Sequence, residues 1–548
     1  MSYSIRICQS RRLESAVPWL SFSLVFAVSL NPLNGAPQVP VEVSIQTDKA
    51  VGVVNPAFLS LAIDSSLAIS GGIAYLRTPR LVALARGLAP AFLRFGGTEQ
   101  DFLIFESSAS KDVWQAASRR HANDEKRCTL PHYPTWLLQK QREKEEMMEP
   151  VLYKRRRTHT VKNATITPDM LDSLNGFASC SGLHLIYGLN ALLRGPGSDW
   201  NSSNAALLLR YTASKGYNFS WELGNEPNSY PHRTGRNVSG TQLGHDFMAL
   251  ARLLESQGLR SASVYGPDVT RPRRSCLRLL QHFLETAARV VKSVTWHHYY
   301  VNGRTATLHD FLDPEILDSL ATEIQDVAQV VQKVSPGSKV WLGETSSAWG
   351  GGAAGLSDAY VAGFMWLDKL GLSARLGIDV VMRQAFVGHG HYTLVDKENE
   401  PLPDYWLSLL YKRLVGRSVL IVQKPGFGGT LRLYTHCTSS DNSPGAVTLF
   451  ALNLQPNNAT MQLTGTLADC TTDEYILEPG DPKAGLRARS VLLNGKKLEM
   501  KSETELPPLL PRRLPQGSLL TLPAQSFGFY VLRDAHVPAC LPQTPIQG

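Results

Sequence analysis

Short apolar segments alternate with amphipathic helical patterns between residues 58 and 386, and this alternation restricts the fold more than any other feature of the chain. The segments with the composition of buried strands are Phe58–Asp64, Ala91–Gly96, His184–Asn190, Phe219–Gly224, Ser263–Pro267, Val294–Tyr299, Lys339–Glu344 and Val380–Phe386. Helical patterns lie between them, for example at Gln242–Gln257, Cys276–Val291, Pro314–Val334 and Ser357–Leu376. Eight such strand–helix units predict an α/β fold with a (β/α)8 barrel. An open nucleotide-binding sheet fits less well, because no Gly-x-Gly-x-x-Gly follows the first strand.

The sequence changes after Gly416, where short strand-like runs are broken by Gly, Pro, Asn and Asp. These runs are Val419–Val422, Leu431–His436, Val447–Asn453, Ala459–Leu463, Ser490–Leu493 and Phe527–Arg533. The pattern predicts an all-β sandwich domain over residues 416–548. The segment Val41–Gln46 is expected to add a strand to this domain from the N-terminal side.

The N-terminal segment has the layout of a secretory signal peptide. Arg6, Arg11 and Arg12 precede an interrupted apolar run from Ala16 to Leu30, which is too short to span a bilayer comfortably. We predict that residues 1–36 are removed and that the rest of the protein is soluble, because no other long apolar run follows.

Glycosylation motifs and cysteines agree with secretion. Asn-x-Ser/Thr sequons occur at Asn163, Asn201, Asn218, Asn237 and Asn458. The seven cysteines show neither a Cys-x-x-Cys pair nor a zinc-binding spacing with histidine, so one or two disulfides are expected.

A charged insert separates the second predicted strand from the third. Residues 107–160 contain the mixed-charge run Lys140–Glu149 and end in the basic run Lys154–Arg157. Such an insert is expected to be exposed and open to proteolysis. It also carries much of the formal net charge of +8, as does the signal region, so bulk charge does not indicate a polyanion partner.

Polar residues stand at the ends of the predicted strands, where a barrel of this kind builds its active site. Two of them are carboxylates: Glu226 follows the fourth strand and is succeeded by Pro227, and Glu344 ends the seventh. Strands four and seven lie on opposite sides of a barrel, so both side chains can face one cleft. Retaining glycoside hydrolysis needs such a pair, and we expect Glu226 to be the acid/base and Glu344 the nucleophile. The alternative is that each is a solvated residue or an ion-pair partner.

The His297-His298 pair does not predict a metal site. Adjacent residues of a strand point to opposite faces, so one histidine should face the site and the other should pack outside. No metal and no cofactor are therefore expected. Tyr299 is a candidate hydrogen-bond donor to the nucleophile, or else a core aromatic residue. Gly350–Gly352 is interpreted as a loop that lines the cleft.

Several long segments resemble the heparanase family. They are Leu93–Thr98, Trp221–Ser229, Val294–Tyr300 with Asn302–Thr307, Val340–Ala348, Gly363–Arg375 and Pro401–Leu410. The resemblance covers nearly the whole chain after the signal peptide. It implies a retaining endo-β-glucuronidase that acts on heparan sulfate chains of proteoglycans, in lysosomes and the extracellular matrix after secretion. It also implies that nucleic acid is not a partner. Contact with a membrane is expected only through proteoglycans.

The resemblance further implies site residues and maturation. Sugar-contacting roles carry over to Asp64, Thr98, Asn225, His297, Arg304, Gly350, Gly351, Gly390 and Tyr392. The precursor is expected to lose a linker, residues 110–158, to a processing protease. A small subunit (37–109) with the first barrel strands then pairs with a large one, which holds the rest of the barrel (159–415) and the β domain. The implied disulfides are Cys128–Cys180 and Cys437–Cys540, with Cys276 and Cys470 free.

The chain departs from the family pattern in three places. The basic patch at the start of the large subunit reads His159 to Asn163 and keeps only Lys162 as a lysine. A second patch keeps Arg273, Arg274 and Arg278 but then has Leu280, Gln281 and Glu285, so polyanion affinity is expected to be lower or more dependent on acidic pH. Arg157 stands where an aromatic residue is usual, which predicts cleavage after the basic run Lys154–Arg157. Two rival functions stay open: a non-catalytic heparan sulfate binder on the same fold, and an exo-β-glucuronidase.

Overall fold

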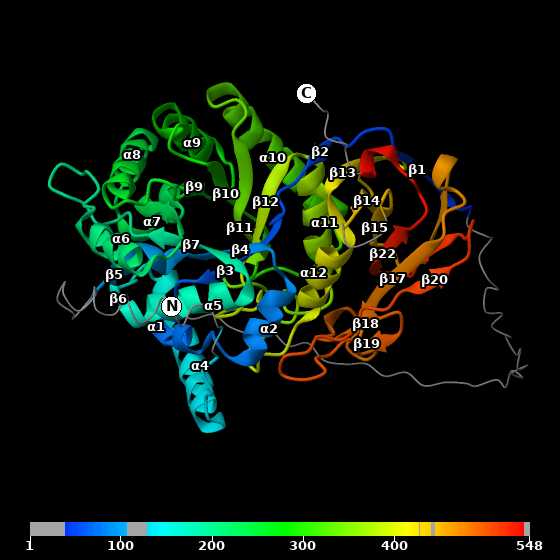
Figure 1. The fold of residues 1–548 in the computed structure, drawn as a ribbon, viewed down its shortest axis with the longest axis horizontal. Helices are drawn as coiled ribbons and strands as arrows, with labels where there is room; N and C mark the ends of the chain where they lie inside the picture. The colour runs from blue at the N-terminus through cyan, green and yellow to red at the C-terminus, as the bar shows by residue number, and fades with distance from the viewer. Residues whose placement is uncertain (1–38, 107–127, 129, 427, 440–443, 542–548) are drawn as a thin grey trace, which may run out of the picture. The chain divides into compact units, whose positions relative to one another are not determined.

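The computed structural model describes residues 39–106, 128, 130–426, 428–439 and 444–541 (Figure 1). The predicted signal peptide and the first part of the predicted linker lie outside the described residues. Within the described ranges, none of the helices has both the length and the apolar character that crossing a bilayer requires.

A closed sheet of eight parallel strands forms the first architectural layer. In pairing order the strands are β8 (Ser220–Leu223), β7 (Leu183–Leu189), β4 (Ala91–Gly96), β3 (Leu59–Asp64), β12 (Ile378–Arg383), β11 (Lys339–Trp349), β10 (Ser293–Asn302) and β9 (Tyr265–Val269). A parallel bridge between Trp221 and Val264 joins the two ends of this order, so the sheet closes into a barrel. The predicted (β/α)8 barrel is confirmed, and each predicted strand overlaps an observed one.

Most helices follow the strands and cover the outside of the barrel (Figure 1). Their bounds are α1 (Leu67–Ser70), α2 (Pro79–Gly87), α4 (Thr135–Arg157), α5 (Pro168–Ser181), α6 (Ser203–Lys215), α7 (Tyr230–Thr234), α8 (Gly240–Ser256), α9 (Arg274–Ala287), α10 (Pro314–Val334), α11 (Ala362–Arg375) and α12 (Pro403–Leu414). Helix α10 has its predicted bounds because Asp313 caps its first turn by accepting from the Glu315 amide at 2.9 Å, with Pro314 in the first helical position.

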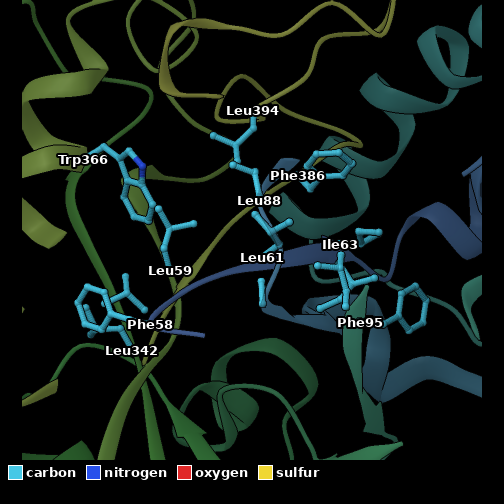
Figure 2. Packing of buried hydrophobic residues seen from close by; sticks show 14 of the residues in the cluster. Phe58, Leu59, Leu61, Ile63, Leu88, Phe95, Leu342, Trp366, Phe386 and Leu394 are labelled. Carbon is cyan, nitrogen blue, oxygen red and sulfur yellow. The ribbon is translucent and has the colours of Figure 1, made fainter. Parts of the chain in front are cut away.

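The barrel strands are buried on both faces. All six residues of β3 are buried, as expected for a parallel strand covered on both faces. Figure 2 shows Leu59, Leu61 and Ile63 of this strand in the same cluster as Phe95 of β4 and Trp366 of α11. This rigid packing fixes the strand ends that carry the polar residues.

The second domain is a mainly antiparallel sheet. Its main strands are β13 (Val415–Lys424), β14 (Leu431–Thr438), β15 (Val447–Asn453), β16 (Ala459–Leu463), β17 (Thr472–Pro479), β21 (Leu520–Leu522) and β22 (Ser526–Leu532), with short strands β2 (Gly52–Val53), β18 (Val491–Leu493), β19 (Lys496–Lys497) and β20 (Arg512–Leu514) at its margins. Strand β1 (Val41–Gln46) pairs with β13 and β16, which confirms the predicted N-terminal contribution. A separate small sheet pairs β5 (Leu103–Phe105) with β6 (Ala164–Ile166).

Side chains of β15 alternate between two hydrophobic clusters, and this explains how the domain packs. Val447 and Leu449 point into the domain's own core, whereas Phe450 and Leu452 belong to the cluster that includes helix α11 of the barrel. Successive side chains of a strand point to opposite faces, so one face closes the sandwich and the other attaches it to the barrel.

Disulfides and sequons are placed as expected. The Cys128–Cys180 and Cys437–Cys540 bonds are present, and Cys276 and Cys470 are free. The sequon asparagines are exposed; they are Asn163, Asn201, Asn218, Asn237 and Asn458. The fold therefore leaves room for glycans, whose attachment stays a prediction.

Candidate active site

Glu226 is aimed into the barrel mouth by a sharp turn after β8. Gly224 and Glu226 both have positive φ, 80° and 53°, and the Glu226 amide donates to the carbonyl of Asp268 at 3.0 Å. A Cβ on Gly224 would lie 2.4 Å from the Tyr230 hydroxyl, so the turn requires glycine there. Pro227 then starts a short 3-10 helix, Pro227–Ser229, which prevents the strand from continuing.

Glu344 is held by a bulge between β10 and β11. Leu342 pairs with Trp296, whereas Glu344 pairs with His297, so Gly343 is an extra residue on β11. A Cβ on Gly343 would lie 2.8 Å from Asp268 Oδ1, which leaves space only for glycine. The predicted strand end at Glu344 is wrong, because β11 continues to Trp349. The bulge, rather than the end of the strand, sets the direction of this carboxylate.

Arg94 connects the two halves of the site from below. Its side chain is fully buried and donates to Glu222 Oε2 at 2.6 Å, Glu344 Oε2 at 2.9 Å and Asn225 Oδ1 at 2.9 Å. Burial, together with the nearby charge of Asp268, raises the pKa of Glu222 to about 8 even though Arg94 opposes this shift. Three strands are therefore tied together through one guanidinium group.

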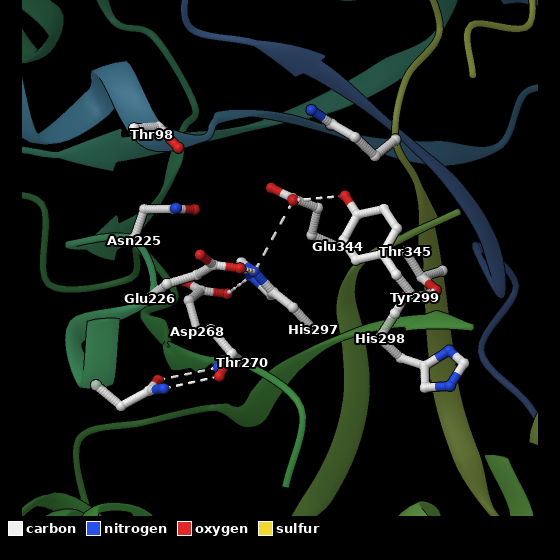
Figure 3. Close-up of polar contacts among 12 residues, drawn as sticks. Thr98, Asn225, Glu226, Asp268, Thr270, His297, His298, Tyr299, Glu344 and Thr345 are labelled. Atoms are coloured by element: carbon white, nitrogen blue, oxygen red, sulfur yellow. Dashed lines mark hydrogen bonds and ion pairs between the residues drawn. The ribbon is translucent and has the colours of Figure 1, made fainter. Parts of the chain in front are cut away.

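His297 lies between two carboxylates (Figure 3). Its Nδ1 is 3.2 Å from Glu226 Oε1, and its Nε2 is 3.3 Å from Asp268 Oδ1. Burial alone would lower the pKa of His297, but the charge of Glu344 and these two hydrogen bonds raise it to about 10. Burial likewise favours a higher pKa for Glu226, yet the hydrogen bond and charge of His297 outweigh it and lower that pKa. We conclude that His297 is cationic and keeps the unliganded Glu226 charged.

The next two residues of β10, His298 and Tyr299, point to opposite faces of the strand, as expected of adjacent strand residues (Figure 3). His298 is buried on the outer face, 3.8 Å from Glu323 of α10, where burial and the charge of Lys369 lower its pKa. Tyr299 points to the site and donates its hydroxyl hydrogen to Glu344 Oε1 at 2.7 Å. The hydrogen bond expected of Tyr299 is thus present, and the nucleophilic role of Glu344 stays a prediction.

One cluster has the composition of a metal site. Among the described residues, Glu226, His297 and Glu344 each place a ligand atom within 4.8 Å of the others. In the unliganded site a cationic His297 offers no lone pair to a metal, and Arg94 donates to Glu344 Oε2 at 2.9 Å. These charges favour a catalytic carboxylate pair, and the absence of a metal stays a prediction.

A cavity of about 250 Å³ opens in front of the two glutamates. Most of the predicted sugar-contacting residues line it: Asp64, Thr98, Asn225, Arg304, Gly350, Gly351, Gly390 and Tyr392. His297 lies behind this lining, against Glu226. Lys162, Arg273 and Arg274 are exposed and do not line the cavity. Any role of these three in substrate binding therefore concerns the surface beyond the cavity.

Two supporting residues were not foreseen. Arg233 of α7 donates to the carbonyls of Asn225 and Glu226 and, at 3.2 Å, to the Thr98 hydroxyl. Asp101 accepts from the Asn225 amide at 3.0 Å, and burial raises its pKa to about 6 against the charge of Arg233. Asp101 lies shortly after Thr98 at the polar end of the second strand, and this position was the sequence signal that could have identified it.

The predicted linker is partly docked on this cavity. In helix α4, Glu149, Leu152 and Tyr153 line it, and Leu152 is buried. The Tyr153 hydroxyl accepts from Arg304 Nε at 2.9 Å, and the guanidinium lies 5.5 Å from the ring centre. The expectation of a fully exposed insert is wrong for this helix, because one of its faces packs against the site.

Known proteins share both the sequence and the fold. A model of the N-terminal domain of glycosyl hydrolase family 79 matches residues 136–371. Heparanase from Mus musculus is 47% identical over 511 residues, which cover 91% of this chain and 94% of the relative. The chain belongs to the heparanase family. Within that family, inactive heparanase-2 from Homo sapiens is 43% identical over 526 residues, which cover 90% of this chain and 89% of the relative.

The fold likeness extends to distant glycosidases. The structure of a 4-O-α-L-rhamnosyl-β-D-glucuronidase from Fusarium oxysporum matches with a TM-score of 0.62 at 16% identity, over 90% of this chain and 100% of that one. At this identity the likeness shows the barrel fold alone. The family match identifies the heparanase-family chain as a glycoside hydrolase.

Proposed function

We propose that this chain is a retaining endo-β-glucuronidase that hydrolyses internal glucuronyl–glucosamine linkages of heparan sulfate chains on proteoglycans. The observation that carries the proposal is the approach of Glu226 and Glu344, which have carboxylate oxygens within 4.8 Å of each other. Retaining enzymes have their carboxyl groups about 5–5.5 Å apart, whereas inverting enzymes leave room for a water molecule between them. The names of the family's heparanases supply the substrate class.

The reaction would proceed in two displacements. A carboxylate oxygen of Glu344 attacks the anomeric carbon while the bond to the leaving oxygen breaks, and Glu226 gives that oxygen a proton. Glu226 then takes a proton from water, the water oxygen attacks the anomeric carbon, and Glu344 leaves as a carboxylate. Each step moves one proton through Glu226, and the two steps together return both glutamates to their starting states.

Neighbouring residues have separate tasks in this scheme. Arg94 and Tyr299 each donate to one oxygen of Glu344, which orients that carboxylate for attack. Asn225 accepts from Arg94 with its oxygen, so its amide nitrogen is the end that can donate to a sugar hydroxyl. Because His297 lowers the pKa of Glu226, acidic pH favours the protonated donor. This agrees with the proposed lysosomal site of action.

Helix α4 supports the proposed maturation. It covers the catalytic cavity with Glu149, Leu152 and Tyr153, so loss of residues 110–158 would uncover this cavity. The basic run Lys154–Arg157 ends this helix, and we propose cleavage after Arg157 by a protease specific for basic residues. N-terminal sequencing of the large subunit tests this: a start far from Thr158 would contradict it.

A cleft that removal of α4 would uncover favours an endo enzyme over an exo enzyme, and the two facing glutamates favour an enzyme over a non-catalytic binder. A size-shift assay on heparan sulfate chains, done with secreted and processed protein, separates the three. Shorter fragments support the proposal, whereas free uronic acid alone or unchanged chains contradict it. The Glu344→Ala variant is the matched control and should leave chain length unchanged.

A further inference from the structure

The carboxylate of Glu149 in helix α4 occupies a small binding site on the wall of the catalytic cavity. One oxygen, Oε1, accepts from the Gly390 amide at 3.2 Å. The other, Oε2, lies 2.9 Å from Nζ of Lys397. A single carboxylate thus bridges a backbone donor and a cation that belong to the same loop after β12.

The surroundings favour an anion at this position. The side chain of Glu149 is about three-quarters buried, at 26% exposure, so its charge is partly removed from water. Burial by itself would raise its pKa, but the hydrogen bond and charge of Lys397, the Gly390 amide and His389 together lower it. The charges of Glu146 and Glu398 also raise the pKa of Lys397. Asp396 instead accepts from the backbone amides of Glu398 and Glu400.

The site is continuous with the groove beneath helix α4. Gly390 and Glu149 line the catalytic cavity. Lys397 lines a second cavity of about 70 Å³, whose other wall is formed by α4 residues such as Gln141 and Glu145. Once α4 has left, the loop from Val387 to Lys397 borders both spaces. A polymer that extends from the catalytic glutamates along this loop would therefore pass the amide of Gly390 and then Lys397.

We propose that Lys397, together with the Gly390 amide, forms an anion subsite that binds a uronate carboxylate of the substrate, and that Glu149 fills this subsite in the uncut chain. The inference rests on the proposed function, because that function supplies an acidic polysaccharide. A uronate matches the contact in kind: its two oxygens are coplanar and can bridge an amide and an ammonium as those of Glu149 do. Lys397 is then a specificity-determining residue outside the catalytic group.

Binding should be measured in the full chain carrying added protease sites at both ends of residues 110–158, folded intact and then cut. A Glu344→Gln background prevents hydrolysis, so calorimetry reports affinity without turnover. The probes are a heparan sulfate hexasaccharide, its carboxyl-reduced form and its desulfated form. Lys397→Met removes the charge, and Lys397→Arg keeps it. Lys497→Met on the β domain is the matched control, because the Lys497 side chain is 56% exposed and that of Lys397 is 42% exposed.

We expect Lys397→Met to lower the affinity for the hexasaccharide and for its desulfated form about tenfold, as the loss of one charge-assisted hydrogen bond predicts. The carboxyl-reduced form should bind wild type and variant equally, Lys397→Arg should recover most of the affinity, and Lys497→Met should have no effect. Equal binding of all probes by Lys397→Met and wild type overturns the proposal, as does a loss that follows the sulfates instead of the carboxylates. Because this binding measurement does not require turnover, it can be interpreted even if the proposed catalytic mechanism is wrong.

Discussion

Removing the hydroxyl of Tyr299 should slow the release of sugar from Glu344 more than the initial attack. In Tyr299→Phe the donor that lies 2.7 Å from Glu344 Oε1 disappears, while Arg94 still binds Oε2. Glu344 regains its negative charge in the second displacement, so the lost hydrogen bond acts there. A hydrogen bond to a buried charged group is worth about 1.5–3 kcal/mol. At roughly 2 kcal/mol, the second step slows about 30-fold.

Stopped-flow measurement with an activated aryl glucuronide distinguishes the two steps. The glycosyl-enzyme should accumulate in Tyr299→Phe, giving a burst of one aryl alcohol per active site followed by slow turnover. Tyr300→Phe is the matched control, because the buried Tyr300 hydroxyl has no hydrogen-bond partner among the described residues. An unchanged kcat for Tyr299→Phe, or a lower kcat without a burst, would refute the assigned role of Tyr299.

Three further predictions concern the carboxylates and the β domain. Glu344→Ala should abolish turnover of every substrate, whereas Glu226→Ala should retain activity on a substrate with a good leaving group; similar losses in that assay would exclude the assigned roles. The pKa of Glu222 is about 8 in the folded protein and near 4.5 when unfolded, so the contribution of Glu222 to stability is full below pH 4.5 and is lost as pH rises to 8. Glu222→Gln should remove this decline, roughly 3.5 kcal/mol between pH 5 and pH 8, in urea unfolding at the two pH values; a persistent decline would show that another group titrates. Replacing Cys437 and Cys540 by serine opens a loop of 103 residues and should destabilise the protein by about 4 kcal/mol; an unchanged thermal midpoint would mean that the bond is redundant.

Elements with a clear local pattern were predictable, and elements stabilised by distant charges were not. Strand β17 was missed because it begins with Thr472, Asp473 and Glu474, which indicate a loop when taken alone. In the structure Arg513 donates to Asp473 at 2.7 Å and Arg512 donates to Glu474 at 2.7 Å, so arginines about 40 residues away make a buried strand possible. The signal for this strand lies in a pairing, not in a run of residues.

The same division applies to the site. Glu226 and Glu344 were recognisable because each follows an apolar strand, yet Glu222 was passed over inside such a run. Its importance depends on Arg94, which reaches it from β4 and joins it to Glu344 on β11. Helix α4 gave the opposite error: its dense charge predicted an exposed insert, and only the docked structure reveals that Leu152 is buried over the cavity.

The sequence by itself determined the alternation of strands and helices, the two glutamates and the family, because hydrophobic period and short motifs are recorded locally along the chain. The tertiary structure alone decided how those parts act together. Closure of the barrel and the extra residue Gly343 bring Arg94, Tyr299 and His297 to the two glutamates. These contacts join strands that are up to 250 residues apart, and no local pattern specifies a distance across a closed barrel.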